Sequence, residues 1–219
     1  MSKIYKANWY NLSKARWEAT SAEIKSVAGD FKGTHESDVE ISCGLISDLI
    51  KENNLQTHRV IDCGAGIGRV TQYVLLNFFS NIDILERDEK FIRYCRKNFA
   101  NNKSIANIYH ESLESFKYSN NYDLIWIQWC VEELMDDDLT NFLIRSKNAL
   151  NKNGLIVLKE NIISDGRAFW QSIHQKIRSP ELFAKIIKDC DLEIIKYYVQ
   201  KDNLNEILDV GIFVLRATK

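Results

Sequence analysis

Short apolar runs alternate along the chain with segments in which apolar residues recur at helical spacing. Continuous apolar runs bounded by polar residues predict buried strands, and a helical period predicts the helices that cover them. The predicted strands are 58–64, 81–88, 105–112, 122–130, 154–161, 192–200 and 210–218. The predicted helices are 41–51, 69–79, 90–99, 136–150 and 180–189, with a turn at 151–154. Strands that alternate with helices predict an α/β fold with a largely parallel sheet covered on both faces.

The starts of two predicted helices carry local signals. The helix at 136–150 opens with acidic residues, which suit the positive end of the helix dipole. The helix at 180–189 opens on Pro180, which favours a first helical turn. In a parallel sheet with right-handed crossovers, ligand-binding loops lie at the carboxyl ends of the strands. The sequence therefore predicts a site in the loops that follow the strands.

Composition bounds the class of protein. The chain has 219 residues, of which 45% are hydrophobic and 27% charged, as is typical of one soluble globular domain. A formal net charge of −1 provides no general attraction to nucleic acid or membranes. We find neither an apolar run of membrane-spanning length nor a signal-peptide core. The 5 cysteines and 4 histidines are dispersed, which argues against disulfides or a metal site and favours a cytoplasmic or, in a eukaryote, nuclear protein.

A glycine-rich stretch, DCGAGIG, follows the first predicted strand. Gly64, Gly66 and Gly68 let the backbone turn sharply and pass close to a ligand. The later glycine of dinucleotide-binding loops and the G-K-[ST] of phosphate-binding loops are both missing. Glu86 ends the next strand about 20 residues on, where an acid can accept hydrogen bonds from ribose hydroxyls. The pattern favours a nucleoside cofactor over the alternatives, a tight turn and a solvated carboxylate.

These motifs resemble those of the class I methyltransferases that use S-adenosylmethionine. ESLESF at 111–116 resembles their loop beside the adenine, and YDLIWIQWC resembles their fourth strand. The combination of DCGAGIGRV, IWIQWCVEEL and NGLIVLKEN further resembles the protein N-terminal (alpha-amino) methyltransferases, and RWEAT and SVAGDF resemble their cofactor-covering segment. The resemblance implies a Rossmann-like fold with a seven-stranded, mostly parallel sheet and an antiparallel last strand. It also implies a helical N-terminal lid at 1–40 and a methyltransferase domain at 41–219.

Carried onto this sequence, the resemblance implies roles for individual residues. Those implied to bind S-adenosylmethionine, which leaves as S-adenosylhomocysteine, are Gly64, Gly66, Arg69, Glu86, Arg87, Ser112, Leu113, Gln128, Trp17 and Val27. Arg69 would pair with the carboxylate of the cofactor, and Glu86 would bind its ribose. Trp129 would line the substrate channel, and Asn161 would lie at the acceptor amine. Because side chains alternate along a strand, Trp126 is expected to face away from Trp129, into the core.

The chemistry of methyl transfer adds a candidate base. Transfer from a sulfonium is an in-line displacement, in which the enzyme mainly positions the reactants. An amine with a pKa near 8 must first lose its proton, which a nearby carboxylate or imidazole can take. Where the family has a histidine for this task, this chain has Glu133. Glu132 beside it would raise its pKa if both were enclosed; the alternative is that both are solvated acids at a helix start.

The stretch after KEN departs from the family, whose members carry several aspartates there. Asp165 is the only acid in 162–179, which also contains Trp170, His174, Lys176 and Arg178. His174 is a candidate base or a surface residue, and a site of this composition should disfavour a lysine in the acceptor. The resemblance nevertheless implies that the acceptor is a protein or peptide N-terminus of the Xaa-Pro-Lys type. The alternative is the amine of a small molecule or of a natural-product or peptide intermediate.

Three other classes of protein fit the sequence less well. A Rossmann oxidoreductase would need the dinucleotide glycine pattern. A catalytically inactive methyltransferase-like subunit would tend to lose the loop at 64–69 and Glu86. An RNA methyltransferase would need a basic stripe with interleaved aromatic residues, which the sequence lacks. We therefore expect no nucleic-acid or membrane partner, and a monomer or homodimer.

Overall fold

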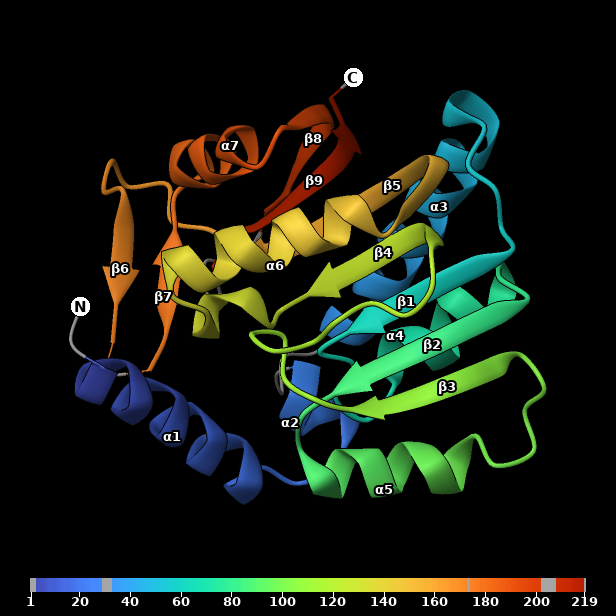
Figure 1. Ribbon diagram of the computed structural model, residues 1–219, viewed down its shortest axis with the longest axis horizontal. Helices are drawn as coiled ribbons and strands as arrows, with labels where there is room; N and C mark the ends of the chain where they lie inside the picture. Colours follow the sequence, from blue (N-terminus) through green and yellow to red (C-terminus); the bar gives the residue numbers. More distant parts are fainter. Residues whose placement is uncertain (1–2, 29–32, 173, 202–207, 219) are drawn as a thin grey trace.

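A seven-stranded sheet forms the centre of the computed structural model, which describes residues 3–28, 33–172, 174–201 and 208–218 (Figure 1). The strands follow the order β3-β2-β1-β4-β5-β9-β8. They are β1 Arg59–Cys63, β2 Asn81–Glu86, β3 Ile105–His110, β4 Tyr122–Gln128, β5 Leu150–Asn161, β8 Leu192–Gln200 and β9 Val210–Ala217. Strand β9 is antiparallel to β5 and β8, whereas the other neighbouring pairs are parallel. A separate small sheet pairs β6 Phe169–Gln171 with β7 Lys176–Arg178.

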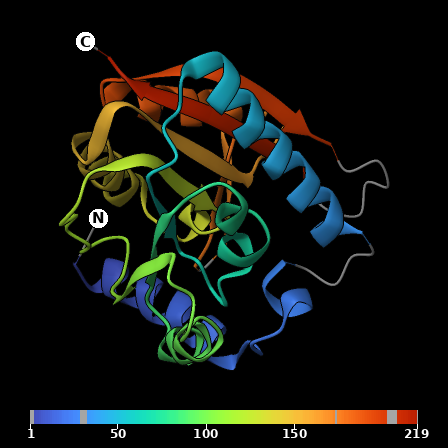
Figure 2. The ribbon, with the colours of Figure 1, turned by 90° about the vertical axis from the view of Figure 1, so that its right-hand side faces the viewer.

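Helices cover both faces of the large sheet. They are α1 Lys3–Ala19, α2 Ile24–Ala28, α3 Thr34–Asn53, α4 Arg69–Tyr73, α5 Glu89–Asn98, α6 Asp136–Asn148 and α7 Pro180–Asp189, with 3-10 turns η1 Leu75–Asn77 and η2 Val131–Glu133. On one face, Phe142 of α6 and Phe183 of α7 share a buried cluster with Ile125 of β4. On the other face, Leu49 of α3 packs in a cluster with Trp126. Figure 2 shows α3 and α6 on opposite sides of the sheet.

Strand β4 shows why a continuous apolar run forms a central strand here. All its residues are buried. Ile125 faces the cluster under α6 and α7, while Leu124 and Trp126 face the cluster under α3. Side chains alternate across a strand, so a strand covered on both faces needs apolar residues at every position. Trp126 therefore lies in the core, as expected.

The predicted fold class is confirmed, including the seven strands, the antiparallel β9 and the N-terminal helix. The helix starts also agree with their signals. Ser179 caps α7 with Pro180 in the first turn, and α6 opens with three aspartates. Asp88 caps α5 by accepting the backbone N–H groups of Lys90 and Phe91. These contacts satisfy N–H groups that a helix cannot bond internally, so they determine where each helix begins.

The predicted helix at 69–79 and the predicted turn at 151–154 differ from the structure. The helix expected at 69–79 stops at Tyr73, and a 3-10 turn follows. The side-chain amide of Asn77 donates to the Tyr73 carbonyl at 2.9 Å, while its backbone N–H bonds to Val74. This side-chain contact competes with the regular helical bond, which accounts for the break. The turn expected at 151–154 is instead an irregular part of β5, where pairing with β4 shifts register. Asn153, at φ 67, accommodates the extra residues.

The N-terminal segment is more helical than the periodicity showed. The helix expected at 41–51 is the later part of α3, which begins at Thr34. The expected division between residues 40 and 41 therefore falls inside this helix, which buries Asp38 on one side of the division and Ser42 on the other. The end of SVAGDF, at 29–31, lies outside the described residues. None of the helices in the described segments is long and apolar enough to cross a membrane. Helix α1 lies at the edge of the sheet toward which β1, β2 and β4 point (Figure 1).

Candidate active site

A cavity opens at the carboxyl ends of β1, β2 and β4, next to α1. The residues implicated by the sequence that line it are Trp17, Val27, Gly64, Gly66, Arg69, Glu86, Arg87, Leu113, Gln128, Trp129 and Glu133. The wall also contains Asp62, Ala65, Val70, Leu85, Phe91, Glu111, Glu114, Cys130 and Leu134, which the sequence did not single out. Among the residues proposed from the sequence, Ser112, Asn161 and His174 are not part of this wall. The structure therefore brings most of the implied cofactor residues together.

The glycine loop is open to the cavity at one position. A Cβ on Gly66, at φ 57, would have only Val27 Cγ1 nearby, at 3.9 Å. A Cβ on Gly64 would lie 2.6 Å from Cys130 Cβ, and one on Gly68 would lie 2.6 Å from Phe99 Cε2. Gly64 and Gly68 are thus required for packing, whereas Gly66 leaves a space that a side chain would fill. That space fits a ligand held against bare backbone.

Glu86 connects the glycine loop to the end of β2. Its carboxylate accepts the backbone N–H groups of Gly66 at 2.8 Å, Arg87 at 2.7 Å and Asp88 at 2.8 Å. Burial raises the pKa of Glu86, although the three N–H groups oppose this shift. A strand-end carboxylate in the cavity wall can accept hydrogen bonds from vicinal hydroxyl groups, as expected for the ribose of the cofactor.

Arg69 belongs to a buried charged cluster with Asp38, Lys159 and Gln128. Its Nη1 lies 2.8 Å from Asp38 Oδ2, and Lys159 Nζ lies 2.5 Å from Asp38 Oδ1. Gln128 donates to the same Asp38 oxygen at 2.8 Å. Two buried cations thus share one carboxylate, and Arg69 also lines the cavity. This arrangement suits the carboxylate at the methionine end of the cofactor.

The electrostatics of this cluster follow from its burial. Burial alone would raise the pKa of Asp38, but Lys159 and Arg69 hold it below its usual value. Burial lowers the pKa of Lys159, although Asp38 opposes the shift. Asp38 lies on α3, a helix in which the sequence predicted no site residue. Its cationic partners Arg69 and Lys159 are distant in the sequence, so nothing in the residues around Asp38 indicates that it forms a buried ion pair.

Trp129 follows β4 in a strained conformation. Its φ of 52 is rare for a bulky residue and marks a site where the surrounding structure imposes the backbone. The ring lies under the guanidinium of Arg69, whose Cζ is 5.1 Å from the ring centroid. Its indole nitrogen is buried without a hydrogen-bond partner among the described residues. Trp129 is thus presented to the cavity, consistent with a wall for a cationic ligand.

Helix α1 binds the far side of the cavity through one face. The residues of this face that contact 132–138 recur at helical spacing and are Lys6, Trp9, Tyr10, Ser13, Arg16 and Trp17. Trp9 Nε1 donates to the Glu133 carbonyl at 2.6 Å. The Glu133 carboxylate accepts Ser13 Oγ, Trp17 Nε1 and, at 2.6 Å, Arg87 Nη2. Glu133 therefore fastens α1 to the cavity wall; its predicted role as a base stays a prediction.

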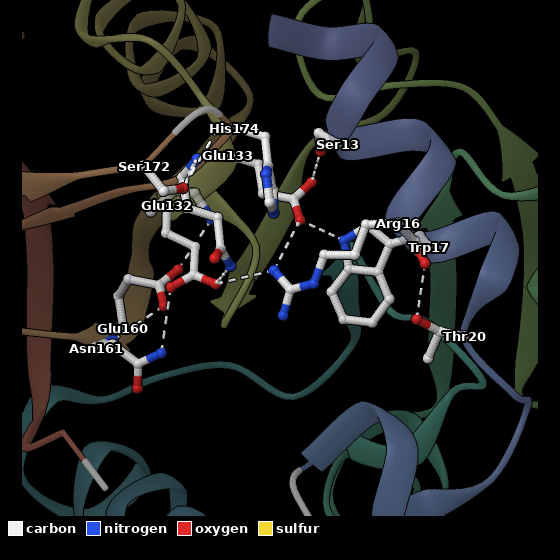
Figure 3. Close-up of polar contacts among 12 residues, drawn as sticks. Ser13, Arg16, Trp17, Thr20, Glu132, Glu133, Glu160, Asn161, Ser172 and His174 are labelled. Carbon is white, nitrogen blue, oxygen red and sulfur yellow. Dashed lines mark hydrogen bonds and ion pairs between the residues drawn. The ribbon is translucent and has the colours of Figure 1, made fainter.

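A second acid lies beside Glu133 and faces Asn161 (Figure 3). Glu132 accepts Asn161 Nδ2 at 3.2 Å and Gln175 Nε2 at 2.6 Å. Burial raises the pKa of Glu132. Burial and the charge of Glu132 raise the pKa of the neighbouring Glu160 to about 8. The sequence suggested a role for Glu132 only as a neighbour of Glu133, whereas in the structure Glu132 pairs with Asn161.

Two of the basic residues in 162–179 turn inward. Lys176 and Arg178 pair with Asp136 of α6, at 2.5 Å and 2.9 Å, and Arg178 is fully buried. Asp165 pairs with Arg167 at 2.5 Å on the surface. His174 lies in the β6–β7 turn, where its backbone N–H donates to Ser172 Oγ at 3.4 Å. Asp136 therefore compensates one of the two positive charges that Lys176 and Arg178 bring to this segment.

Known proteins share both the sequence and this architecture. The family model described as AdoMet dependent proline di-methyltransferase, where AdoMet is S-adenosylmethionine, matches residues 5–216. The alpha N-terminal protein methyltransferase 1 of Arabidopsis thaliana is 30% identical, over 96% of this chain and 80% of that protein. The N-terminal Xaa-Pro-Lys N-methyltransferase 1-B of Xenopus laevis is 28% identical, over 95% of each.

A solved S-adenosylmethionine-dependent methyltransferase from Leishmania major has a TM-score of 0.88 at 27% identity, covering 99% of this chain and 87% of that one. The open face of Gly66, the carboxylate of Glu86 and the cationic side of Arg69 suit the three parts of that cofactor. A family match over nearly the whole length, around a cavity of this chemistry, means that the chain is a S-adenosylmethionine-dependent methyltransferase and belongs to the AdoMet-dependent proline di-methyltransferase family.

Proposed function

We propose that this enzyme methylates the alpha-amino group of protein or peptide N-termini of the Xaa-Pro-Lys type. The observation that carries the proposal is the hydrogen bond between Asn161, at the end of β5, and Glu132 of η2. Trp129, at the end of β4, bonds through its backbone N–H to the carbonyl of Lys159, two residues before Asn161. An amine presented there meets a carboxylate and an amide oxygen as acceptors, beside an aromatic wall. The names of the Arabidopsis and Xenopus relatives support this acceptor.

The chain's own residues position the reactants. When bound, S-adenosylmethionine supplies a methyl group activated by the positive charge of its sulfonium. Glu86 and the open backbone at Gly66 would hold the ribose, Arg69 the carboxylate, and Leu113 the adenine. In-line displacement needs little covalent help from the protein, so holding donor and acceptor in line accounts for most of the catalysis.

Helix α1 would enclose the reacting groups. Trp17 belongs to the cavity wall and bonds to Glu133, so the end of α1 covers one side of the cavity. Lys90 of α5 donates to the carbonyls of Trp17 at 2.9 Å and Glu18 at 3.1 Å, which fixes the C-terminal end of the helix. Exclusion of water at this edge strengthens the electrostatic contacts to a cationic cofactor and amine.

The proposal includes the proline and the lysine of the acceptor. Lys176 and Arg178 share Asp136, which lowers their combined positive charge and so weakens their opposition to a cationic third residue. Exposed aromatic side chains at Phe169 and Trp170 lie on β6, in the same hairpin as Gln175, which donates to Glu132. We further propose a cytoplasmic location, because the five cysteines are free, as in a reducing compartment.

The test is titration calorimetry with S-adenosylmethionine, then mass spectrometry of peptides incubated with the loaded enzyme. We expect methylation of an Xaa-Pro-Lys peptide and none of its N-acetylated form. A peptide with glutamate at the third position separates a lysine preference from a general preference for proline. If the cofactor binds but neither free peptide is methylated, the proposal is wrong, and small-molecule amines become the acceptors to screen.

A further inference from the structure

Arg16 of α1 places its guanidinium between the carboxylates of Glu132 and Glu133, of which Glu133 lines the cavity (Figure 3). Its Nη1 lies 4.0 Å from Glu132 Oε1 and 3.8 Å from Glu133 Oε1. The Arg16 side chain is 41% exposed, whereas those of Glu132 and Glu133 are 9% and 7% exposed. Both distances exceed that of a direct hydrogen bond, so Arg16 compensates the charge of the acids without being fixed by them.

The two acids differ in their other partners. Glu133 is held by Arg87, Ser13 and Trp17, and its place in the fold is thus accounted for. The side-chain donors described on Glu132 are the neutral amides of Asn161 and Gln175. A buried carboxylate requires a nearby cation, and in the described part of the chain Arg16 is the one within 4.0 Å of Glu132. Arg16 lies on α1, and its side chain is partly exposed to solvent.

We infer that Glu132 receives the ammonium group of the acceptor and takes its proton, and that Arg16 occupies this position until the acceptor displaces it. The inference rests on the proposed methylation of an amine. An ammonium group carries the same charge as Arg16 and is compact enough to donate directly to Glu132 and to the Asn161 oxygen. Exchange of one cation for another keeps the buried charge balanced, which offsets the cost of desolvating the acceptor.

The proton and electron balance of the step is simple. The ammonium gives one proton to Glu132, and the freed lone pair forms a bond to the methyl carbon. The bond between that carbon and sulfur breaks, and its electron pair stays on sulfur. Glu132 then releases its proton to water when the product leaves.

The charged groups around Glu132 suit a proton acceptor. Those that face it are Arg16 from α1, Glu133 from η2 and Glu160 from β5, with His174 next to Gln175 in the β6–β7 turn. Burial and the charge of Glu132 raise the pKa of Glu160, and a proton held on Glu160 lets Glu132 remain ionised beside it. Burial raises the pKa of Glu132 itself, which makes it a stronger base than an exposed carboxylate.

The first experiment compares Arg16→Ala with Lys14→Ala. Lys14 is a 64% exposed residue of the same helix that pairs with Glu18, so it controls for loss of a charge on α1. With an Xaa-Pro-Lys peptide we expect Arg16→Ala to lower the KM about two- to fivefold and to leave kcat unchanged, as for release of an exposed ion pair. Lys14→Ala should change neither. A KM that stays the same or rises in Arg16→Ala overturns the role of Arg16.

The second experiment uses Glu132→Gln, alone and combined with Arg16→Ala. We expect kcat to fall about 100-fold and the acidic limb of the kcat/KM profile to disappear, while the affinity for S-adenosylmethionine, measured by calorimetry, stays within about twofold. Arg16→Ala should give no further gain in the double variant. Unchanged kcat in Glu132→Gln, with the cofactor still bound, overturns the assignment.

Failure of the proposed acceptor is distinguishable from failure of this inference. If the wild type methylates no peptide, the proposed function fails. Calorimetry with prolinamide on enzyme saturated with S-adenosylhomocysteine still tests Glu132. Weaker prolinamide binding to Glu132→Gln than to the wild type supports the inference, and equal binding overturns it.

Discussion

The backbone N–H of Gly66 donates to the Glu86 carboxylate at 2.8 Å, and this bond joins the loop after β1 to the end of β2. The two residues lie 20 positions apart in the sequence. They are also the two features by which a nucleoside cofactor is expected to be recognised: bare backbone and a carboxylate. Glu86 thus fixes the glycine loop and also lines the cavity. Its loss is therefore expected to weaken cofactor binding both by removing a direct contact and by loosening the loop.

Gly66→Ala should weaken S-adenosylmethionine binding by at least about tenfold while the protein stays folded. The added Cβ would project into the open space next to Val27, and the positive φ adds strain of about 1 kcal/mol. Gly166→Ala is the matched control, because Gly166 also has a positive φ and open space around it but lies outside the cavity wall. Equal cofactor affinities of the two variants by calorimetry would refute the position assigned to Gly66.

Glu86→Gln should reduce cofactor affinity about 10- to 100-fold, because hydrogen bonds to a charged acceptor contribute about 1.5–3 kcal/mol each. The amide keeps the shape but has one acceptor oxygen for the N–H groups of Gly66, Arg87 and Asp88. Calorimetry measures the effect. Glu89→Gln, an exposed acid three residues on, serves as the control. Retention of full affinity in Glu86→Gln would remove Glu86 from the cofactor site.

Asp38→Asn should lower the free energy of unfolding by about 3 kcal/mol, since Lys159 and Arg69 would lose their shared buried counter-charge. Asp48→Asn makes the same change at an exposed position of α3 and should have little effect. Urea unfolding followed by circular dichroism measures both. A loss below about 1 kcal/mol in Asp38→Asn would mean that the cluster is already solvated or uncharged.

Glu133→Gln should loosen α1, because the carboxylate binds Ser13, Trp17 and Arg87 together. We expect faster amide hydrogen exchange across Lys3–Ala19 and several-fold weaker cofactor binding. Glu18→Gln, on the exposed side of the same helix, is the comparison. A drop in turnover with unchanged exchange in α1 would instead support the base role predicted from the sequence.

Stability should fall as the pH rises from about 4.5 to about 8, in part because of Glu160. The pKa of this acid is raised from 4.5 to about 8 in the folded protein, chiefly by burial, so the folded state holds a proton that the unfolded state has lost in this range. The free energy of unfolding, measured in urea at pH 5.5, 6.5 and 7.5, should therefore decline less steeply in Glu160→Gln than in the wild type. Parallel curves would show that Glu160 titrates normally.

The core of the fold was predictable from local patterns. Strand β4 is a largely apolar run, and the starts of α5 and α7 are set by the capping residues Asp88 and Ser179 directly before them. The break after Tyr73 was not predictable, because it depends on one side-chain bond from Asn77 that competes with a regular helical bond. The small sheet of β6 and β7 was also missed, since three-residue strands leave no periodic signal.

In the candidate site, too, residues fixed by local patterns were predictable and those fixed by distant contacts were not. Gly66 and Glu86 were found because loop geometry and strand ends dictate their residue types. Asp38 and Arg16 were not found, since each acts through partners more than 30 positions away. The docking face of α1 has helical spacing, but it mixes the charged residues Lys6 and Arg16 with Trp9, so a search for apolar periodicity does not detect it.

Helix α1 is attached at both flanks of the cavity, to η2 and α6 through its docking face and to α5 through Lys90. The helix is therefore held at two separate places along its length. If a bound cofactor leaves past α1, at least one of these two sets of contacts must break first. Detachment of α1 breaks these polar contacts and also exposes Trp9, which is buried in the core. We therefore expect release of the spent cofactor to depend on how readily α1 detaches.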